Sequence, residues 1–522
     1  MGTAVLPHLS SIAGPFIDDD LPYVANAESV HSLTSAVGLF AREYPADGLY
    51  RPLTGLVYAV GWALWGSQPV GFHLLNLALW VLTALAVDAF ARRHLTDGTA
   101  LATTLLFLAH PAHCEVVDHV TGLADLLSSL LLFVALLVPR WKALLLFFLA
   151  LLAKESAAVL PGLLVVITVT LEPGSRIAAR LVPYGVALAA WGAIKVHAVG
   201  SFGPRDVMIQ DPDVVSWAAT LGAVALRYLQ ILCFPIELAV DRAYRIGVGV
   251  HYRFDAAATL GFALVLALVL AFLLLVRRKP HVAFGIGWAL VAMAPYAHAV
   301  PFGALMAERF LHTALLGFAW ALVATFATVP ISRVLLVLTV AAWSVRSAMR
   351  SADWRDPVAI WAPIVAAHPD DPLAHFALGK LYLEQGRTSE ARTELEAGLA
   401  LNPHSGVARN RLGMALLREG DLDGADAQFE AASREPDDRA TAMNGRGTVA
   451  ARQGRLVTAR TWFVNALAIE PEHVQARENL RDTEETIARA IAARDSSPDP
   501  AVVRAACTAL EDSACLDRLD PP

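Results

Sequence analysis

Roughly the first two thirds of this chain contain apolar runs long enough to cross a lipid bilayer. Ala256–Val276, for example, contains no Asp, Glu, Lys or Arg. A helix needs about 20 apolar residues to span the hydrocarbon core, and irregular backbone cannot face lipid. The sequence therefore predicts an all-α fold that begins with a polytopic membrane helical bundle.

Nine further ranges, together with Ala256–Val276, complete this prediction. We expect spans at Val70–Phe90, Thr99–Ala109, His119–Val138, Ala143–Ala153, Ser156–Leu171, Leu181–His197, Ala256–Val276, Val282–His298, Phe310–Val329 and Val334–Val345. Met1–Phe16 is apolar but shorter than a span, and no Lys or Arg precedes it. We interpret it as a short first helix, or as a start codon placed too late. Counting it, about eleven spans are expected.

Basic residues predict the topology, because Lys and Arg favour the cytoplasmic ends of spans. The clusters are Arg92-Arg93, Arg140 with Lys142, Arg176 with Arg180, Arg277-Arg278-Lys279, and Arg333. All fall on one side if Trp217–Phe234 is interfacial or re-entrant, which we prefer. The carboxyl end is then exoplasmic. If Trp217–Phe234 crosses, the carboxyl end is cytoplasmic instead.

The charge is concentrated in the last third of the chain. Ser351–Pro522 carries 28 acidic and 19 basic residues, whereas the first 350 positions carry 20 and 22. This indicates a soluble acidic domain after the membrane domain, and no strong basic patch favours nucleic-acid binding.

The soluble part repeats every 34 residues. Three sets of residues keep this interval: Gly379, Gly413 and Gly447; Ala391, Ala425 and Ala459; Leu395, Phe429 and Phe463. Small residues at helix crossings with this period are the tetratricopeptide signature. We expect three full repeats over about 372–473, a half repeat before them and a capping helix after them. The predicted domains are 1–348 (membrane), 349–494 (repeats) and 495–522 (linker and short tail).

The four cysteines, Cys114, Cys233, Cys507 and Cys515, show no metal-ligand spacing. Cys507 and Cys515 pair if the tail lies in an oxidising compartment. Two unpaired core thiols are the alternative.

The stretch from His110 to Leu127 is the most polar interruption of the membrane region. Six titratable residues fall within it: His110, His113, Glu115, Asp118, His119 and Asp125. Ionisable groups at a membrane boundary are costly to dehydrate and often mark a functional site. The simpler alternative is a polar loop. Under the preferred topology, this stretch shares the exoplasmic side with Asp18–Asp20, Arg51, Lys154-Glu155 and Glu308-Arg309.

Several motifs in this order resemble one protein family. They are FIDDD…N (Phe16–Asn26), YRPLT (Tyr50–Thr54), GFHLLN (Gly71–Asn76), HPAHCEVV…GLADLL, LLAKES (Leu151–Ser156), AERFL (Ala307–Leu311) and the repeat tail. The set resembles the transmembrane and tetratricopeptide-repeat-containing O-mannosyltransferases and their bacterial relatives. One departure is Leu123, which stands where the family usually has Arg.

The resemblance implies a glycosyltransferase of the GT-C fold that takes a sugar from a polyprenyl phosphate. In this family the catalytic carboxylate lies in the first outer loop, where Asp19 and Asp20 match the pattern best and Asp18 precedes them. Asp19 is then the expected base, with Asp20 as its neighbour or as a metal contact. The alternative is that these aspartates only begin a solvated loop and take no part in catalysis.

Further polar residues are candidates for contacts with the donor phosphate or substrate. Arg51 lies at the membrane edge, where snorkelling to lipid headgroups is the alternative role. The remaining candidates are His110, His113, Glu115, Asp125, Lys154, Glu155, Glu308 and Arg309. Lys154-Glu155 and Glu308-Arg309 have a structural alternative, in which they pair within the bundle.

His110, His113 and Glu115 also suggest a divalent-cation site, but their spacing is not one helical face. We expect hydrogen bonds and donor contacts there instead, with no certain metal or cofactor.

The predicted function is transfer of a sugar, by resemblance mannose, from a lipid-linked donor to Ser or Thr of an acceptor protein bound by the repeats. A bacterial inner-membrane protein with periplasmic repeats is expected. A non-catalytic membrane-anchored scaffold for envelope proteins is the alternative function. Intramembrane His and Asp also suggest a proton-coupled transporter, but the polar groups gather at one face rather than along a path.

Overall fold

The computed structural model describes residues 2–17, 19–45, 48–174, 176–201, 213–236, 238, 253–297, 304–329, 331–435, 438–497 and 499–519. The chain divides into two compact units, Met1–Ile360 and Trp361–Pro522. The described residues are helical apart from turns, loops and one isolated bridge between Tyr44 and Tyr50. Asp18 lies outside the described residues.

The first unit begins with short helical turns. These are α1 (Gly2–Val5), η1 (Leu6–His8), η2 (Ser11–Ala13), η3 (Leu21–Ala25), η4 (Glu28–Val30), α2 (Leu33–Val37) and η5 (Gly38–Ala41). The expectation of one short helix over Met1–Phe16 was therefore wrong. Pro7 and Pro15 lack the N–H that a helix interior needs, and the backbone is already extended at Gly14.

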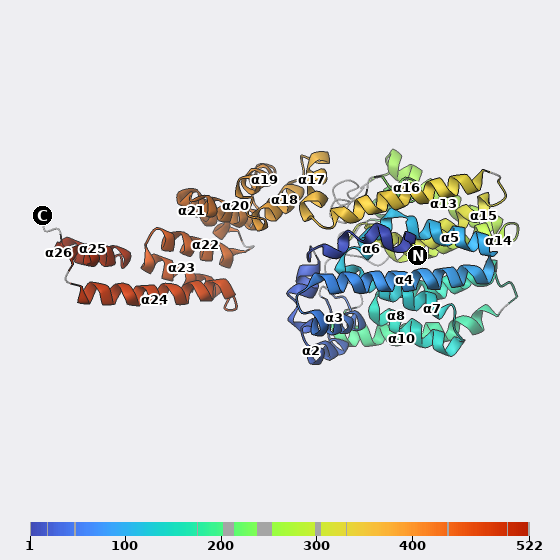
Figure 1. Cartoon of the computed structure of the whole chain (residues 1–522), viewed down its shortest axis with the longest axis horizontal. Coiled ribbons are helices and arrows are strands. Elements are labelled where there is room, and N and C mark those ends of the chain that lie inside the picture. The colour runs from blue at the N-terminus through green and yellow to red at the C-terminus, as the bar shows by residue number, and fades with distance from the viewer. Residues whose placement is uncertain are drawn as a thin grey trace. The chain divides into compact units, whose positions relative to one another are not determined.

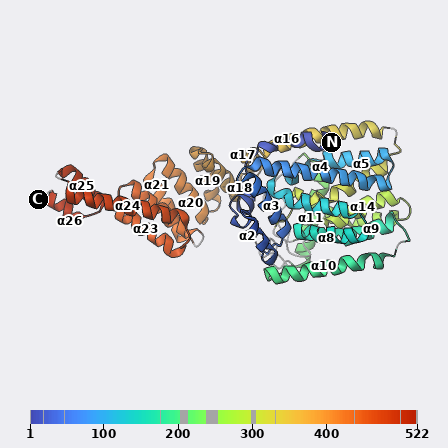
Figure 2. The same cartoon turned by 60° about the horizontal axis from the view of Figure 1, so that its bottom comes forward.

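Longer helices follow these turns. They are α3 (Pro52–Trp65), α4 (Pro69–His94), α5 (Asp97–Ala109), η6 (Pro111–His113), α6 (Cys114–Val117), η7 (Val120–Gly122), α7 (Leu123–Ala135), α8 (Arg140–Ala153), η8 (Glu155–Val159), α9 (Leu160–Thr170), α10 (Ile177–Val199), α11 (Val214–Cys233), α13 (Ala256–Leu275), α14 (Pro280–Met293), η9 (Ala294–Tyr296), η10 (Glu308–Leu311), α15 (Ala314–Phe326) and α16 (Ser332–Asp353). Figures 1 and 2 both show α4, α8, α10 and α16 running along one common direction.

Five of these helices, α4, α10, α11, α13 and α16, are long and apolar enough to cross a membrane. A sixth candidate is α5 with the bent continuation Pro111–Val117, at an angle of 56°. Shorter apolar helices, Glu155–Thr170 and α15 among them, occupy other predicted ranges. The membrane character is thus confirmed for the described residues, and the count of eleven spans stays a prediction.

The contacts of α11 bear on whether it crosses. Near its start, the indole N–H of Trp217 donates to the Ala297 carbonyl beyond α14. Near its end, the Leu232 carbonyl lies 3.3 Å from His110 Nε2. Ala297 and His110 belong to the same end of the bundle, since Tyr296 stacks on Phe310 and the neighbouring Arg309 binds Glu115. The two ends of α11 thus contact Ala297 and His110, and the preferred non-crossing position of Trp217–Phe234 stays a prediction.

The basic clusters gather at the opposite end, which we call the arginine end. Arg93 donates to the carbonyls of Leu136 and Leu137 after α7, and Arg140 donates to the Ala179 carbonyl of α10. Near Lys279, His281 lies 6.4 Å from Trp320, whose ring is also 6.4 Å from His94. These clusters therefore share one end, as the charge pattern predicted.

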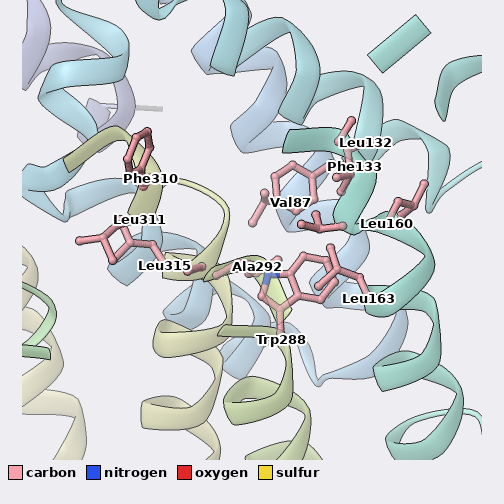
Figure 3. Close-up of a cluster of buried hydrophobic side chains, with 14 of the residues drawn as sticks. Val87, Leu132, Phe133, Leu160, Leu163, Trp288, Ala292, Phe310, Leu311 and Leu315 are labelled. Carbon is pink, nitrogen blue, oxygen red and sulfur yellow. The ribbon is translucent and has the colours of Figure 1, made fainter. Parts of the chain in front are cut away.

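The core of the bundle is built from large aromatic side chains between helices. Trp288 of α14 is fully buried, stacks 6.1 Å from Phe133 and donates its indole N–H to the Thr313 carbonyl. Figure 3 shows this ring among aliphatic side chains, with Phe310 in the same cluster. Since Phe310 belongs to η10, this packing also positions the neighbouring Glu308 and Arg309.

The second unit consists of helical hairpins that follow one another (Figure 1). The boundary between the two units falls between Ile360 and Trp361, inside helix α17 (Pro357–Ala367). The helices are α18 (Pro372–Glu384), α19 (Thr388–Leu401), α20 (Gly406–Glu419), α21 (Leu422–Arg434), α22 (Arg439–Arg452), α23 (Leu456–Ile469), α24 (Val474–Ser496), α25 (Pro500–Ala509) and α26 (Ser513–Leu519). Three hairpins, α18–α19, α20–α21 and α22–α23, occupy the three predicted repeats. Cys507 and Cys515 form a disulfide.

The periodic glycines permit close contact between the two helices of each repeat. A Cβ at Gly379 would lie 2.7 Å from Leu395, and one at Gly413 would lie 2.7 Å from the Phe429 ring. The third glycine, Gly447, is as close to Phe463, at 2.5 Å. The repeating glycines and large side chains of the sequence are therefore partners.

We expect Gly413→Ala to destabilise the repeats by about 1–3 kcal/mol, because the added methyl group must displace a buried aromatic ring. Thermal unfolding of the full chain, followed by circular dichroism, measures this effect. Ser389→Ala, at an exposed position of α19, is the matched control. Equal melting curves for both variants would contradict this packing argument.

Candidate active site

The turn from His110 to Leu123 is bent because Pro111 ends α5. Short helical segments η6, α6 and η7 then carry the chain to α7. A Cβ at Gly122 would lie 2.0 Å from the Val116 carbonyl oxygen, so only glycine fits this tight turn. All six titratable side chains that the sequence places between His110 and Asp125 are buried. Buried charges need partners, and the partners come from distant segments.

Two carboxylates of this stretch bind cations from other segments. Glu115 accepts hydrogen bonds from the Arg309 backbone N–H at 2.8 Å and from its guanidinium at 2.5 Å. Asp125 at the start of α7 accepts from Lys154 Nζ at 2.6 Å. Both Asp125 and Lys154 are almost fully buried.

A third ion pair lies beside these two. Arg51, just before α3, binds Glu155 through two hydrogen bonds, of 2.9 and 2.5 Å. Burial acts to raise the pKa of Glu155, but the Arg51 charge and hydrogen bonds outweigh it and lower the pKa to about 2. The same segment of α3 is tied to the end of α8, since the Thr54 hydroxyl donates to the Ala153 carbonyl.

A small polar cavity lies next to the ion pairs. Its lining includes Asp125, Ser128, Ser129, Ser156, Tyr296 and Arg309. Its free volume is about 10 Å³, enough for one water molecule. A sugar can therefore enter this cavity only if neighbouring side chains move.

Asp20 is fixed in the loop between η2 and η3. One carboxylate oxygen accepts from the Thr121 backbone N–H at 2.8 Å and lies 3.1 Å from His119 Nε2. The other oxygen accepts from the Ile17 N–H. Asp20 is fully buried, whereas Asp19 is partly exposed and its carboxylate has no hydrogen bond or ion pair with any described residue.

The acidic loop and the ion pairs are linked through α3. Tyr58 of that helix is buried and lies one turn after Thr54, whose hydroxyl binds the Ala153 carbonyl beside Lys154. Its hydroxyl donates to the Val120 carbonyl at 3.1 Å. The carboxylate loop, the histidine-rich turn and the cations are therefore neighbours at one end of the bundle.

The remaining predicted residues have other partners. His110 contacts the Leu232 carbonyl, and His113 Nδ1 lies 3.0 Å from His312 Nδ1. Glu308 is fully buried, with Arg350 of α16 at 3.5 Å. The side chains of His110, His113 and Glu115 thus point to different partners and do not form a common metal site.

A different trio does gather at one point. Among the described residues, His8, Cys114 and Asp118 bring potential metal-ligating atoms within 4.8 Å of one another. However, His8 Nδ1 already lies 2.9 Å from Asp118 Oδ1, which also accepts from the Ser11 hydroxyl. These hydrogen bonds explain the cluster without an ion.

Sequence reasoning missed several residues of this region. Tyr58, Thr121, His312 and Arg350 were not among the candidates, although His312 directly follows the AERFL motif. Thr121 acts through its backbone N–H, which no side-chain pattern reveals. Arg350 lies near the end of an apolar helix, where its charge resembles an ordinary membrane flank.

Burial raises the pKa of Asp20 to about 6, although His119 and the N–H groups of Thr121 and Ile17 act to lower it. This pKa lies above the ordinary 3.8, so the folded state favours the protonated form. The associated stability is present below about pH 4 and is lost as pH rises through 6. We therefore expect the melting temperature of Asp20→Asn to rise relative to the unmodified protein between pH 5 and 7, measured by scanning fluorimetry in detergent. Parallel pH curves would contradict this expectation.

Comparison with known proteins identifies relatives of this chain and a family model that matches its repeats. The tetratricopeptide-repeat family model matches residues 344–406 and 410–474. A protein O-mannosyl-transferase of Caenorhabditis elegans, F38B6.6, is 21% identical over 428 residues, which cover 77% of this chain and 62% of that protein.

Two further relatives match shorter stretches. Human protein O-mannosyl-transferase TMTC4 is 32% identical over 150 residues (24% of this chain, 20% of that protein). Drosophila melanogaster protein O-mannosyl-transferase Tmtc1 is 35% identical over 124 residues (22% of this chain, 14% of that protein). The chain spans less than two thirds of the length of these curated relatives. Its homologues are nevertheless protein O-mannosyl-transferases of the transmembrane and tetratricopeptide-repeat type, which confirms the resemblance drawn from the sequence motifs.

Proposed function

We propose that this protein transfers mannose from a polyprenyl phosphate to a Ser or Thr hydroxyl of an acceptor protein. The observation that carries the proposal is that α3 contacts both the turn that binds Asp20 and the chain beside Lys154 and Glu155. Such a reaction needs a carboxylate to accept the hydroxyl proton. It also needs positive charge to stabilise the departing phosphate.

Asp19 is the base in this proposal. Its carboxylate is partly exposed and is not held by any described residue, so it is free to meet an incoming hydroxyl. Asp20 is a positioning residue, since both of its oxygens bind the backbone of neighbouring turns. In this role, Asp20 fixes the loop that carries Asp19 against the Val120–Gly122 turn.

The three cations would bind the donor phosphate by exchanging part of their contact with carboxylates for contact with phosphate oxygens. Arg51 and Arg309 keep 15% and 21% of their side-chain surface exposed, whereas Lys154 keeps 4%. The two arginines are therefore the direct phosphate contacts, and Lys154 acts from behind them. A guanidinium presents a rigid fork of donors that matches a phosphate.

The acceptor would be held by the repeats, because stacked helical hairpins form extended peptide-binding surfaces. The Cys507–Cys515 disulfide supports an exoplasmic position for this unit, since disulfides persist in oxidising compartments. For a bacterial protein this compartment is the periplasm, with the bundle in the inner membrane.

The alternative is a membrane-anchored scaffold without catalysis. The observation that favours it is the small free volume between the ion pairs, which holds one water molecule but no sugar. A transfer assay with the full chain distinguishes the two functions.

The assay supplies radiolabelled mannosyl polyprenyl phosphate and a Ser/Thr-rich acceptor protein to the purified chain in liposomes. Label in the acceptor that is released by β-elimination supports the proposal. GDP-mannose as sole donor should give no product, and a chelator arm shows whether a divalent cation contributes. No transfer from lipid-linked mannose to any acceptor would favour the scaffold.

A further inference from the structure

A second cleft lies at the arginine end of the bundle, away from the proposed active site. Its volume is about 450 Å³. Its walls come from the end of α7, the start of α8, the middle of α9 and the start of α10. The residues that matter here are Leu136, Arg140, Leu164, Arg176, Arg180 and Tyr184.

The cleft is strongly positive. Arg140, Arg176 and Arg180 line it, and Glu172 compensates one of these charges by pairing with Arg180. Arg140 and Arg176 are both exposed, and Arg140 is anchored by its hydrogen bond to the Ala179 carbonyl. Arg93 adds a fourth guanidinium at the end of α7, where it binds the Leu136 and Leu137 carbonyls.

Two helix starts add to this positive potential. Helix α8 begins at Arg140 and α10 begins at Ile177, and neither has a side-chain cap. The first backbone N–H groups of a helix lack partners within the helix and favour anions. Guanidinium groups thus line a cleft between two helix starts, which suits a phosphate.

The rest of the cleft is apolar. Leu136, Leu164 and the buried ring of Tyr184 line it together with the arginines. A free phosphate would use only the polar part, whereas a phospholipid would place its phosphate among the arginines and its acyl chains along these side chains. Basic pockets between membrane helices commonly bind such headgroups.

We propose that this cleft binds an anionic phospholipid, with Arg140 and Arg176 as its principal phosphate contacts. The proposal does not rest on the mannosyltransferase function. Its site lies at the opposite ends of α7 and α8 from Asp125 and Lys154, so the two sites can be tested separately.

Native mass spectrometry of the full chain in a neutral detergent tests the proposal. We expect the unmodified protein to retain phosphatidylglycerol in preference to phosphatidylcholine. Arg140→Gln with Arg176→Gln should weaken phosphatidylglycerol binding roughly thirtyfold, because each cation near a headgroup contributes on the order of a factor of five. Arg277→Gln with Arg278→Gln removes the same charge from exposed positions at the same end of the bundle and is the matched control.

Two further arms keep the test decisive. If the double variant does not fold, Arg176→Gln alone should weaken binding about fivefold, because this exposed side chain anchors no described element. Inorganic phosphate at millimolar concentration should not displace the lipid. Equal phosphatidylglycerol binding by the Arg140/Arg176 and Arg277/Arg278 variants would overturn the proposal. Displacement of the lipid by inorganic phosphate alone would overturn the assignment to a phospholipid.

Discussion

Asp19→Asn should lower mannose transfer from a lipid-linked donor at least a hundredfold and leave the melting temperature unchanged. A positioned general base typically contributes 10²–10⁴-fold to a rate. No described residue depends on the Asp19 carboxylate for a hydrogen bond, so its loss should not disturb the fold. Initial rates with radiolabelled mannosyl polyprenyl phosphate, together with scanning fluorimetry, measure both effects.

Two variants serve as controls for this experiment. Glu28→Gln removes an exposed carboxylate from the same segment before α3 and should keep full activity. Asp20→Asn should lower activity and also change thermal stability, because Asp20 binds the Thr121 and Ile17 backbone. Full activity of Asp19→Asn would remove Asp19 from the reaction, and an inactive Glu28→Gln would show that the assay reports folding instead.

Lys154→Met should destabilise the bundle by about 3–5 kcal/mol, because it leaves the Asp125 carboxylate buried without its cation. Asp125→Asn should be destabilising for the converse reason. The double variant should recover most of the loss, since neither charge then remains uncompensated. Unfolding by SDS titration in mixed micelles, arranged as a double-mutant cycle, measures the coupling energy.

The cycle has a clear contrary outcome. If the two single effects add in the double variant, Lys154 and Asp125 do not interact in the folded bundle. The same residues are then free to contact other groups, and the arrangement of the three ion pairs must be revised. A control cycle on the exposed pair Arg434 and Glu430 should give a coupling below about 1 kcal/mol.

Local patterns predicted the repeats well. The 34-residue interval identified Gly413 and Phe429 as recurring positions, and the structure shows them in contact. This prediction succeeds because each repeat is a hairpin whose contacts lie within a short stretch of sequence. The apolar ranges of the membrane region likewise coincide with helices, since apolar length reflects bilayer thickness.

The partners within the candidate site could not be predicted in the same way. Glu115 and Arg309 are separated by 194 positions, and Asp125 and Lys154 by 29. Charge type alone does not decide which cation meets which carboxylate. The sequence likewise left open which groups His110, His113 and Glu115 contact. The bend at Pro111 and the short helical turns after it direct successive side chains toward different helices.

The first segment shows a further limit of composition. The apolar content of Met1–Phe16 is similar to that of a membrane-spanning helix. Its prolines nevertheless produce short turns instead of one helix. One of these turns places His8 against Asp118, a contact of 2.9 Å across 110 positions. Apolar content predicted burial there, but not the backbone conformation.

Photo-crosslinking with a mannosyl polyprenyl phosphate that carries a diazirine beside the phosphate tests the central claim most directly. The crosslinked peptides of the full chain, identified by mass spectrometry, should include Arg51 and the Ala307–Leu311 segment. Excess unlabelled donor should prevent the labelling. Labelling confined to the arginine end, around Arg140 and Arg176, would contradict the assignment of the donor site to the three ion pairs.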